Sequence, residues 1–101
     1  MSLNNFVAFR YASEFYQFCE TLKLPTHLRD QLRRSSSSVA LNLAESSGKS
    51  TPADRRRFYA IANGSFQESK AILMLTNVSL GAKAKLVDEL GAILYRLVYP
   101  K

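Results

Sequence analysis

The chain has 101 residues, of which 47% are hydrophobic and 22% charged, and its formal net charge is +6 at pH 7. This length fits a single domain over residues 1–101 with a poor surface-to-volume ratio. The single cysteine, Cys19, excludes an intrachain disulfide, and one histidine with one cysteine does not make a zinc site. Neither a signal peptide nor a run of the ~18 apolar residues that a membrane helix needs is present, so we expect a cytoplasmic protein.

The first predicted helix spans about residues 4–22 and carries a broad apolar arc. Two adjacent stripes at helical spacing make the arc wider than the ~100° stripe that is typical of a surface helix. One helix of a small monomer cannot easily bury such an arc, so the pattern favours an oligomer. Cys19 lies in one stripe, where a buried apolar role is favoured over a reactive thiol. The stripes are Phe6, Phe9, Ala12, Tyr16 and Cys19, and Val7, Tyr11, Phe15, Phe18 and Leu22.

The second predicted helix spans about residues 26–47, after a break at Leu24-Pro25. Thr26 is predicted to cap it by accepting a bond from a backbone N–H. Apolar residues continue at helical spacing through Ser35–Ser38, so we interpret this run as helical and not as a flexible linker. Small side chains there would let a neighbouring helix come close. Gly48 is predicted to end the helix in a left-handed conformation.

The third predicted helix begins at Thr51-Pro52-Ala53-Asp54, which combines a hydroxyl cap, an early proline and an acid in the first turn. It is expected to span about residues 52–80 and to end at Gly81. At Asn63-Gly64 the flanking period of 3.6 favours close helix packing over a β-hairpin. A fourth helix over about residues 83–98 follows from apolar residues at four-three-four spacing, which are Leu86, Leu90, Ile93 and Leu97.

Four helices with short connections and no strand pattern predict an all-α, up-down-up-down antiparallel four-helix bundle. Gly48-Lys49-Ser50-Thr51 is similar to part of a phosphate-binding loop, but Leu43 stands where that motif requires a glycine and no strand precedes it. No catalytic set can be assembled around a single histidine, and neither Glu45 nor Glu68 has the Glu-x-x-His spacing of a bundle metal site. We therefore expect no catalysis, no cofactor and no metal.

Polar residues also occur where the second and third helices should face each other. Buried polar groups need hydrogen-bond partners, so a cluster of such side chains would fix how the two helices register. The residues predicted to form this structural polar cluster are Asn42, Glu45, Asn63, Ser65 and Glu68.

Basic residues are concentrated in the middle of the chain. Seven of the 14 Lys and Arg residues lie between Arg29 and Arg57, against three acids, which gives a local net charge of +4. Such a positive rim near the turn between the second and third helices would attract phosphate backbones without reading their sequence. The alternative is a basic face that is merely solvated. The candidate nucleic-acid-binding residues are Arg29, Arg33, Arg34, Lys49, Arg55, Arg56 and Arg57.

Residues 31–68 hold a motif with fixed internal spacing, which comprises Gln31-Leu32, Arg34, Ser38-Val39, Asn42-Leu43-Ala44-Glu45, Gly48-Lys49, Thr51, Asp54, Phe58, Ile61-Ala62, Gly64-Ser65 and Glu68. In these residues the chain resembles the four-helix-bundle family of the 23S rRNA intervening-sequence proteins, which includes the accessory variability determinant of diversity-generating retroelements. Serines at 35, 36 and 46 depart from the family's Ala-Ala pair and Gly, and Lys49 replaces Arg.

The resemblance implies a ring-like homopentamer with a basic surface. Its retroelement branch implies binding of RNA or DNA and of a reverse transcriptase, and its intervening-sequence branch implies a gene within ribosomal RNA genes. We therefore expect a non-enzymatic, oligomeric nucleic-acid-binding accessory protein with weak sequence specificity. The alternative is a protein-interaction scaffold whose charge only keeps it soluble. An enzyme is the third option, which a tightly bound metal in purified material would favour.

Overall fold

The computed structural model describes residues 3–101, which form four α-helices, one short 3₁₀-helix and no strand within that range. The elements are α1 (Leu3–Glu20), α2 (Thr26–Ser47), α3 (Pro52–Leu75), η1 (Gly81–Lys83) and α4 (Ala84–Val98). The predicted all-α class and four α-helices are thus confirmed. None of the described helices is both long enough and apolar enough to cross a membrane.

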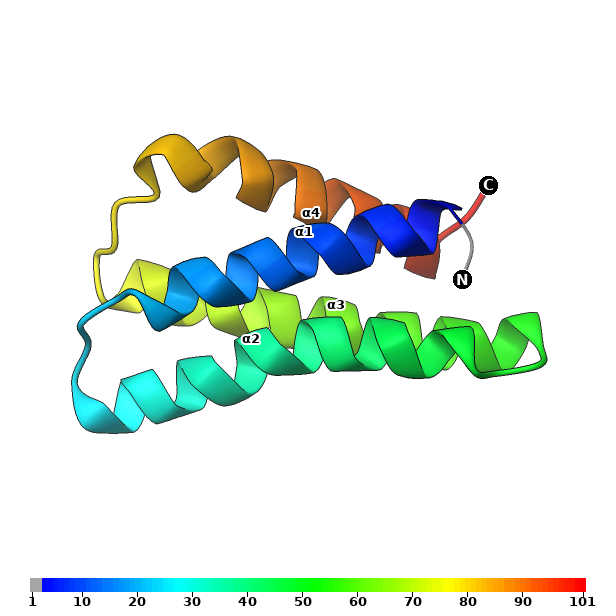
Figure 1. Ribbon diagram of the computed structural model, residues 1–101, viewed down its shortest axis with the longest axis horizontal. Helices are drawn as coiled ribbons and strands as arrows, with labels where there is room; N and C mark the ends of the chain where they lie inside the picture. The colour runs from blue at the N-terminus through cyan, green and yellow to red at the C-terminus, as the bar shows by residue number, and fades with distance from the viewer. Residues whose placement is uncertain (1–2) are drawn as a thin grey trace.

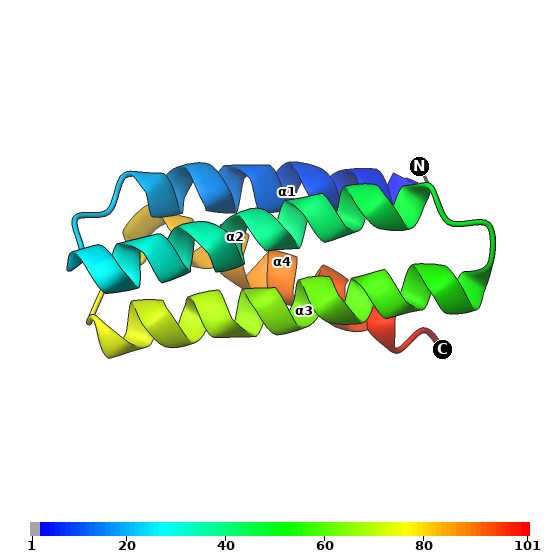
Figure 2. The same ribbon diagram turned by 90° about the horizontal axis from the view of Figure 1, so that it is seen from below.

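The helices lie along one axis of an elongated body that measures 40 × 25 × 18 Å. Each helix contacts its neighbours in sequence, and α1 also contacts α4. The chain reverses direction at each connection, so the α2–α3 turn lies at the same end as the start of α1 and the end of α4 (Figures 1 and 2). We call this the turn end. The far end holds the α1–α2 and α3–α4 connections.

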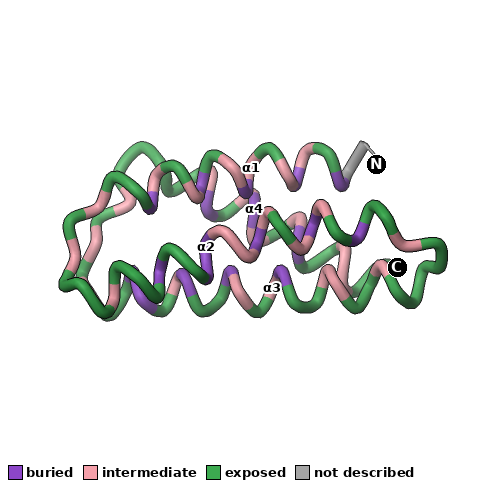
Figure 3. The backbone as a smooth tube through the Cα atoms, turned by 60° about the horizontal axis from the view of Figure 1, so that its bottom comes forward, coloured by how far each residue is buried: buried purple, intermediate pink, exposed green. Residues whose placement is uncertain are grey.

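The core lies between the four helices and centres on two aromatic rings. Phe15 of α1 and Phe66 of α3 are both fully buried and meet edge to face, with ring centroids 5.3 Å apart. Gly91 lets α4 approach them, because a Cβ at that position would lie 3.1 Å from Cε2 of Phe66. Leu32 and Leu90 extend the core along α2 and α4. Figure 3 shows that buried positions recur on the inward sides of the helices.

The third helix ends at Leu75, five residues before the predicted end, and the prediction that Gly81 stops it is wrong. Asn77 adopts the left-handed conformation with φ 57°, which asparagine tolerates better than most residues. Its N–H bonds the carbonyl of Met74, and the N–H of Val78 bonds the carbonyl of Leu73 at 3.0 Å. These two bonds form a Schellman motif that satisfies the last carbonyls of α3.

Two other predicted helix ends differ from the structure. Gly48 has φ −88° and stays right-handed, because its N–H bonds the carbonyl of Glu45 as in a continuing helical turn. Thr26 makes no capping bond, since Pro25 occupies the cap position and its carbonyl accepts the first backbone bonds of α2. The predicted start of α3 is confirmed, because Thr51 Oγ1 accepts a bond from the Asp54 N–H at 3.1 Å.

The broad apolar arc of α1 is largely covered within one chain. Phe15 is buried, Phe9 and Tyr11 pack against the core, and Phe6 is 54% exposed. Gly64, which was predicted to pack closely on a helix, is exposed and an added Cβ would meet no atom within 4 Å. Exposed large apolar side chains occur on all four helices, and they are Phe6, Leu41, Ile61, Met74, Leu75, Tyr95 and Tyr99.

The two threonines offer a matched test of helix capping. We expect Thr51→Ala to reduce the free energy of unfolding by about 1 kcal/mol, because the Asp54 N–H loses its partner. Thr26→Ala should change it by less than ~0.5 kcal/mol, since that hydroxyl makes no cap. Urea unfolding followed by circular dichroism measures both, and equal losses in the two variants would contradict the assignment.

Candidate functional site

The seven basic residues that were predicted to form one rim lie at two ends of the molecule. Arg29, Arg33 and Arg34 are on the first turns of α2 at the far end, whereas Lys49 and Arg55–Arg57 lie at the turn end. With a rise of 1.5 Å per residue, the intervening part of α2 separates the two groups by roughly 20–30 Å. The prediction of a single basic rim was therefore wrong, because the straight helix α2 holds the two groups of basic residues apart.

The far-end group is partly neutralised by an acid from α1. Arg33 Nε donates a hydrogen bond to Glu20 Oε1 at 3.0 Å, and this bond raises the pKa of Arg33. Both side chains keep access to water, so the pair adds little stability. Arg29 and Arg34 are exposed and form no ion pair among the described residues. The far-end group thus has two cations, Arg29 and Arg34, without a carboxylate partner among the described residues, and Asp30 lies between them in the sequence.

At the turn end, two basic residues are engaged around one aromatic ring. Lys49 Nζ lies 3.3 Å from Glu45 Oε1 and 5.0 Å from the centre of the Phe58 ring. Arg57 lies 3.9 Å from Asp54 and 4.8 Å from the same ring centre. Both cations are within the range of cation–π attraction. Their charge is thus shared with carboxylates, and both side chains are held near the Phe58 ring.

Arg55 and Arg56 form no ion pair among the described residues. Arg55 Nη1 donates a hydrogen bond to the carbonyl of Lys49 at 3.1 Å, which holds its guanidinium against the turn. A carbonyl leaves the formal charge in place, and four further N–H donors of the group remain. These two arginines therefore present the least compensated charge of the turn end.

They also line an open groove between α3 and the end of α4, with a volume of about 260 Å³, which we call the arginine groove. Arg96, from the last turn of α4, adds a third guanidinium that the sequence interpretation missed. The signal for it was the predicted up-down order of the helices, in which the end of the fourth helix returns to the start of the third. The lining residues are Pro52, Arg55, Arg56, Tyr59, Arg96, Leu97 and Pro100.

The predicted structural polar cluster is present only in part. Asn42 Nδ2 donates to Ser38 Oγ at 2.9 Å, and Ser38 Oγ lies 2.8 Å from Ser65 Oγ on α3. A second pair, Ser35 and Ser69, shares a hydrogen bond of 2.7 Å inside the bundle. Asn42 and Ser65 thus belong to one network, and serine hydroxyls that were not in the predicted set link α2 to α3.

The other three predicted members lie outside this network. Glu45 is exposed and pairs with Lys49, and Glu68 is exposed with no partner among the described residues. Asn63 is half-buried, and its Oδ1 has no hydrogen-bond partner in the described part of the chain. The prediction failed for the glutamates because a carboxylate is strongly solvated, whereas small hydroxyls fit a close helix contact at lower cost.

Cys19 has the environment of an inert core residue. It is 4% exposed, and burial raises the pKa of its thiol to about 12. The thiolate, which is the reactive form, is therefore scarce at neutral pH. No group of three His, Cys, Asp or Glu side chains in the described residues is placed to hold a metal ion.

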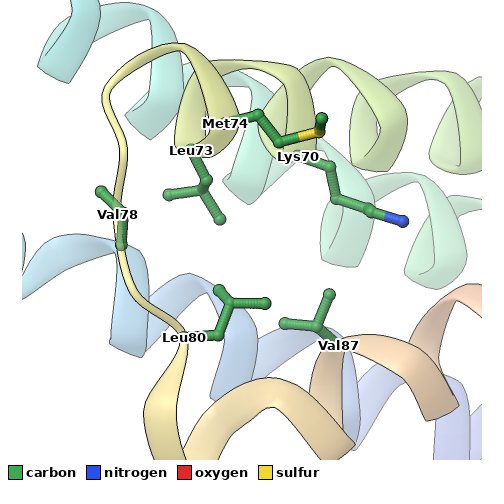
Figure 4. A pocket seen from close by; sticks show the side chains of 6 residues that line it. All are labelled: Lys70, Leu73, Met74, Val78, Leu80 and Val87. Atoms are coloured by element: carbon green, nitrogen blue, oxygen red, sulfur yellow. The ribbon is translucent and has the colours of Figure 1, made fainter.

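A second, smaller cavity of about 80 Å³ lies beneath the α3–α4 connection at the far end. In Figure 4, Leu73, Leu80 and Val87 point toward one another, while the nitrogen of Lys70 points away. Lys70 Nζ lies 5.6 Å from the centre of the Phe66 ring. The lining offers apolar contact and no group for acid–base or nucleophilic chemistry.

The comparisons with known proteins give one result. The family model described as 23S rRNA-intervening sequence protein matches residues 7–96. The match extends well beyond residues 31–68, on which the resemblance was based, and it includes most of α1 and α4. No curated protein and no solved structure matches the chain.

The hydrogen bond between Ser35 and Ser69 can be tested by a double-mutant cycle. We expect Ser35→Ala and Ser69→Ala each to cost about 1 kcal/mol of unfolding free energy, because each leaves a buried hydroxyl with one partner fewer. The double variant should lose less than the sum, by at least ~0.5 kcal/mol. Ser37→Ala is the control, since that exposed hydroxyl bonds only the Arg34 carbonyl. Strict additivity would exclude the pairing.

The raised pKa of Cys19 predicts a loss of stability in alkali. The pKa of the Cys19 thiol in the folded protein, about 12, exceeds the ordinary value of 9.0. The contribution of the protonated thiol to the free energy of unfolding is therefore complete below pH 9 and is lost as pH rises toward 12. Between pH 7.5 and pH 10 the native chain should lose about 1 kcal/mol more than Cys19→Ala. Urea unfolding of both proteins at each pH measures this difference, in which the effects of all groups common to the two proteins cancel. Parallel losses would mean that the thiol is not desolvated.

Proposed function

The chain belongs to the 23S rRNA-intervening sequence protein family, and on this premise we propose that it is a non-enzymatic, oligomeric accessory protein that binds nucleic acid with weak sequence specificity. The proposed contact surface is the turn end, with Lys49 and Arg55–Arg57. The observation that carries the proposal is that Arg55 and Arg56 bear charges that no carboxylate pairs with among the described residues.

Guanidinium groups at a helix start suit a phosphate backbone. Each group is planar and offers two parallel N–H donors, which match two phosphate oxygens. Phosphate contacts position a protein on nucleic acid but carry no sequence information. Arg29, Arg33 and Arg34 lie too far away to touch the same phosphates, so they serve in this proposal as a separate, weaker contact.

A ring-like homo-oligomer, and specifically a homopentamer, is part of the proposal. Exposed large apolar side chains on all four helices support it, because association would remove apolar surface from water. The course of the chain in Figures 1 and 2 fits an antiparallel up-down-up-down subunit with its basic turn at one end. Copies related by rotation would place several such ends on one rim, and linked weak sites gain affinity through effective concentration.

A cytoplasmic location also belongs to the proposal. The support is Cys19, a lone buried thiol that fits a compartment in which cysteines stay reduced.

A protein-interaction scaffold is the second candidate function. Met74 and Leu75, at the end of α3, are 75% and 71% exposed, and Met74 lines the small apolar cavity of Figure 4. Two neighbouring apolar side chains of this size suit a protein partner, for which the family resemblance suggests a reverse transcriptase. In that case the basic charge of the chain would serve only solubility.

Two matched charge reversals test the proposal with labelled RNA and DNA oligonucleotides. At ~50 mM salt, Arg56→Glu should weaken binding on the order of 10-fold, and affinity of the native protein should fall steeply as salt rises. Arg34→Glu, a reversal at another exposed arginine, on α2, should weaken binding by less than ~3-fold because Arg34 lies at the far end. Light scattering should give the same oligomer mass for all three proteins. Negligible binding at low salt, or binding insensitive to salt, would favour the scaffold.

A further inference from the structure

We propose that the arginine groove holds one nucleotide unit of a single-stranded nucleic acid, with its phosphate on Arg55, Arg56 and Arg96 and its base against Tyr59. The inference rests on the proposed function and adds to it a binding mode, a strand preference and a residue from α4. It is carried by the presence of three arginine residues and a tyrosine in the lining of one open groove.

The charge of the groove comes from two helices that are far apart in sequence. Arg55 and Arg56 lie in the first turns of α3, and Arg96 lies in the last turn of α4. No acidic residue is among the lining side chains, and none of the three arginines forms an ion pair within residues 3–101. The bond from Arg55 to the Lys49 carbonyl fixes one guanidinium in advance, which lowers the entropy that binding costs.

The remaining wall of the groove is apolar and suits a planar ring. Tyr59 is half-buried and packs against the core on one side, and it lines the groove together with Leu97. Pro52 and Pro100 complete this wall with rigid rings. A phosphate group alone would make no favourable contact with such an apolar surface, whereas a nucleotide base can stack on an aromatic side chain.

The groove has room for about one nucleotide unit, and its open shape suits a unit of a polymer. Its volume of about 260 Å³ is just below the ~300–1,000 Å³ of sites that enclose small ligands. Arg56 and Arg96 are exposed, so the groove is open to a chain that enters and leaves. In a duplex the bases are paired and stacked and cannot reach Tyr59. A single strand can turn one base toward it, which predicts a preference for single strands.

The experiment compares a labelled 12-nucleotide single strand, as RNA and as DNA, with a duplex hairpin of equal charge by fluorescence anisotropy at low salt. The native protein should bind the single strands more tightly. Arg96→Gln should weaken that binding roughly 3- to 10-fold and lower the slope of log affinity against log salt by about 0.7. Tyr59→Leu should weaken it roughly 5-fold or more without changing the slope.

Three variants serve as controls. Tyr59→Phe keeps the ring and its core packing and should retain binding, so a loss in Tyr59→Leu alone reports stacking. Lys85→Gln removes one exposed charge from the other end of α4 and should have little effect on single-strand affinity. The Arg96→Gln result stands by itself if Tyr59→Leu fails to fold, because Arg96 is exposed and outside the core.

The outcomes separate this inference from the proposed function. Equal binding of single strands and duplex, with Arg96→Gln no different from Lys85→Gln, would overturn the groove and leave general nucleic-acid binding intact. Absence of any nucleic-acid binding by the native protein would remove both. A polyglutamate peptide that competes as strongly as the oligonucleotide would assign the groove to an acidic peptide instead.

Discussion

Close contact between α2 and α3 through small hydroxyl side chains is the interaction on which the rest of the structure depends. Ser35 meets Ser69, and Ser38 meets Ser65, with oxygens 2.7 and 2.8 Å apart. Larger side chains would separate the helices, and unpaired hydroxyls would carry a desolvation cost. This contact fixes the direction of α3, and α3 in turn carries Phe66 into the core and the arginines to the turn end.

Ion pairing decides which of the basic residues are available to a partner. Arg33, Lys49 and Arg57 each have a carboxylate within 4.0 Å, whereas Arg55, Arg56 and Arg96 have none among the described residues. Arg55, Arg56 and Arg96 lie where α3 begins and α4 ends, so this group of unpaired charges is formed by two separate parts of the chain, whereas Arg29 and Arg34 are unpaired at the far end. In the proposed function, the end that carries the three arginines is the one that an anionic partner contacts.

Local sequence signals predicted the helices well wherever the determinant was itself local. The hydroxyl of Thr51, the ring of Pro52 and the acid of Asp54 predicted the start of α3, and in the structure the Thr51 side chain caps this helix. The end of α3 was missed because the left-handed residue that follows this helix is Asn77, whereas Gly81, which also has a positive φ, lies further along the chain. In the candidate site, Arg55 and Arg56 were predicted, but Arg96 was not, since forty residues separate it from Arg56 along the chain.

By itself the sequence determined the all-α class, the number of α-helices and the family, because apolar periodicity, caps and a motif with fixed internal spacing are properties of neighbouring residues. Only the tertiary structure decided that the basic residues divide between two ends and that Glu45 and Glu68 face water. It also decided that Arg96 joins Arg55 beside Tyr59. These facts depend on which helix faces lie together, and that is set by packing between residues distant in sequence.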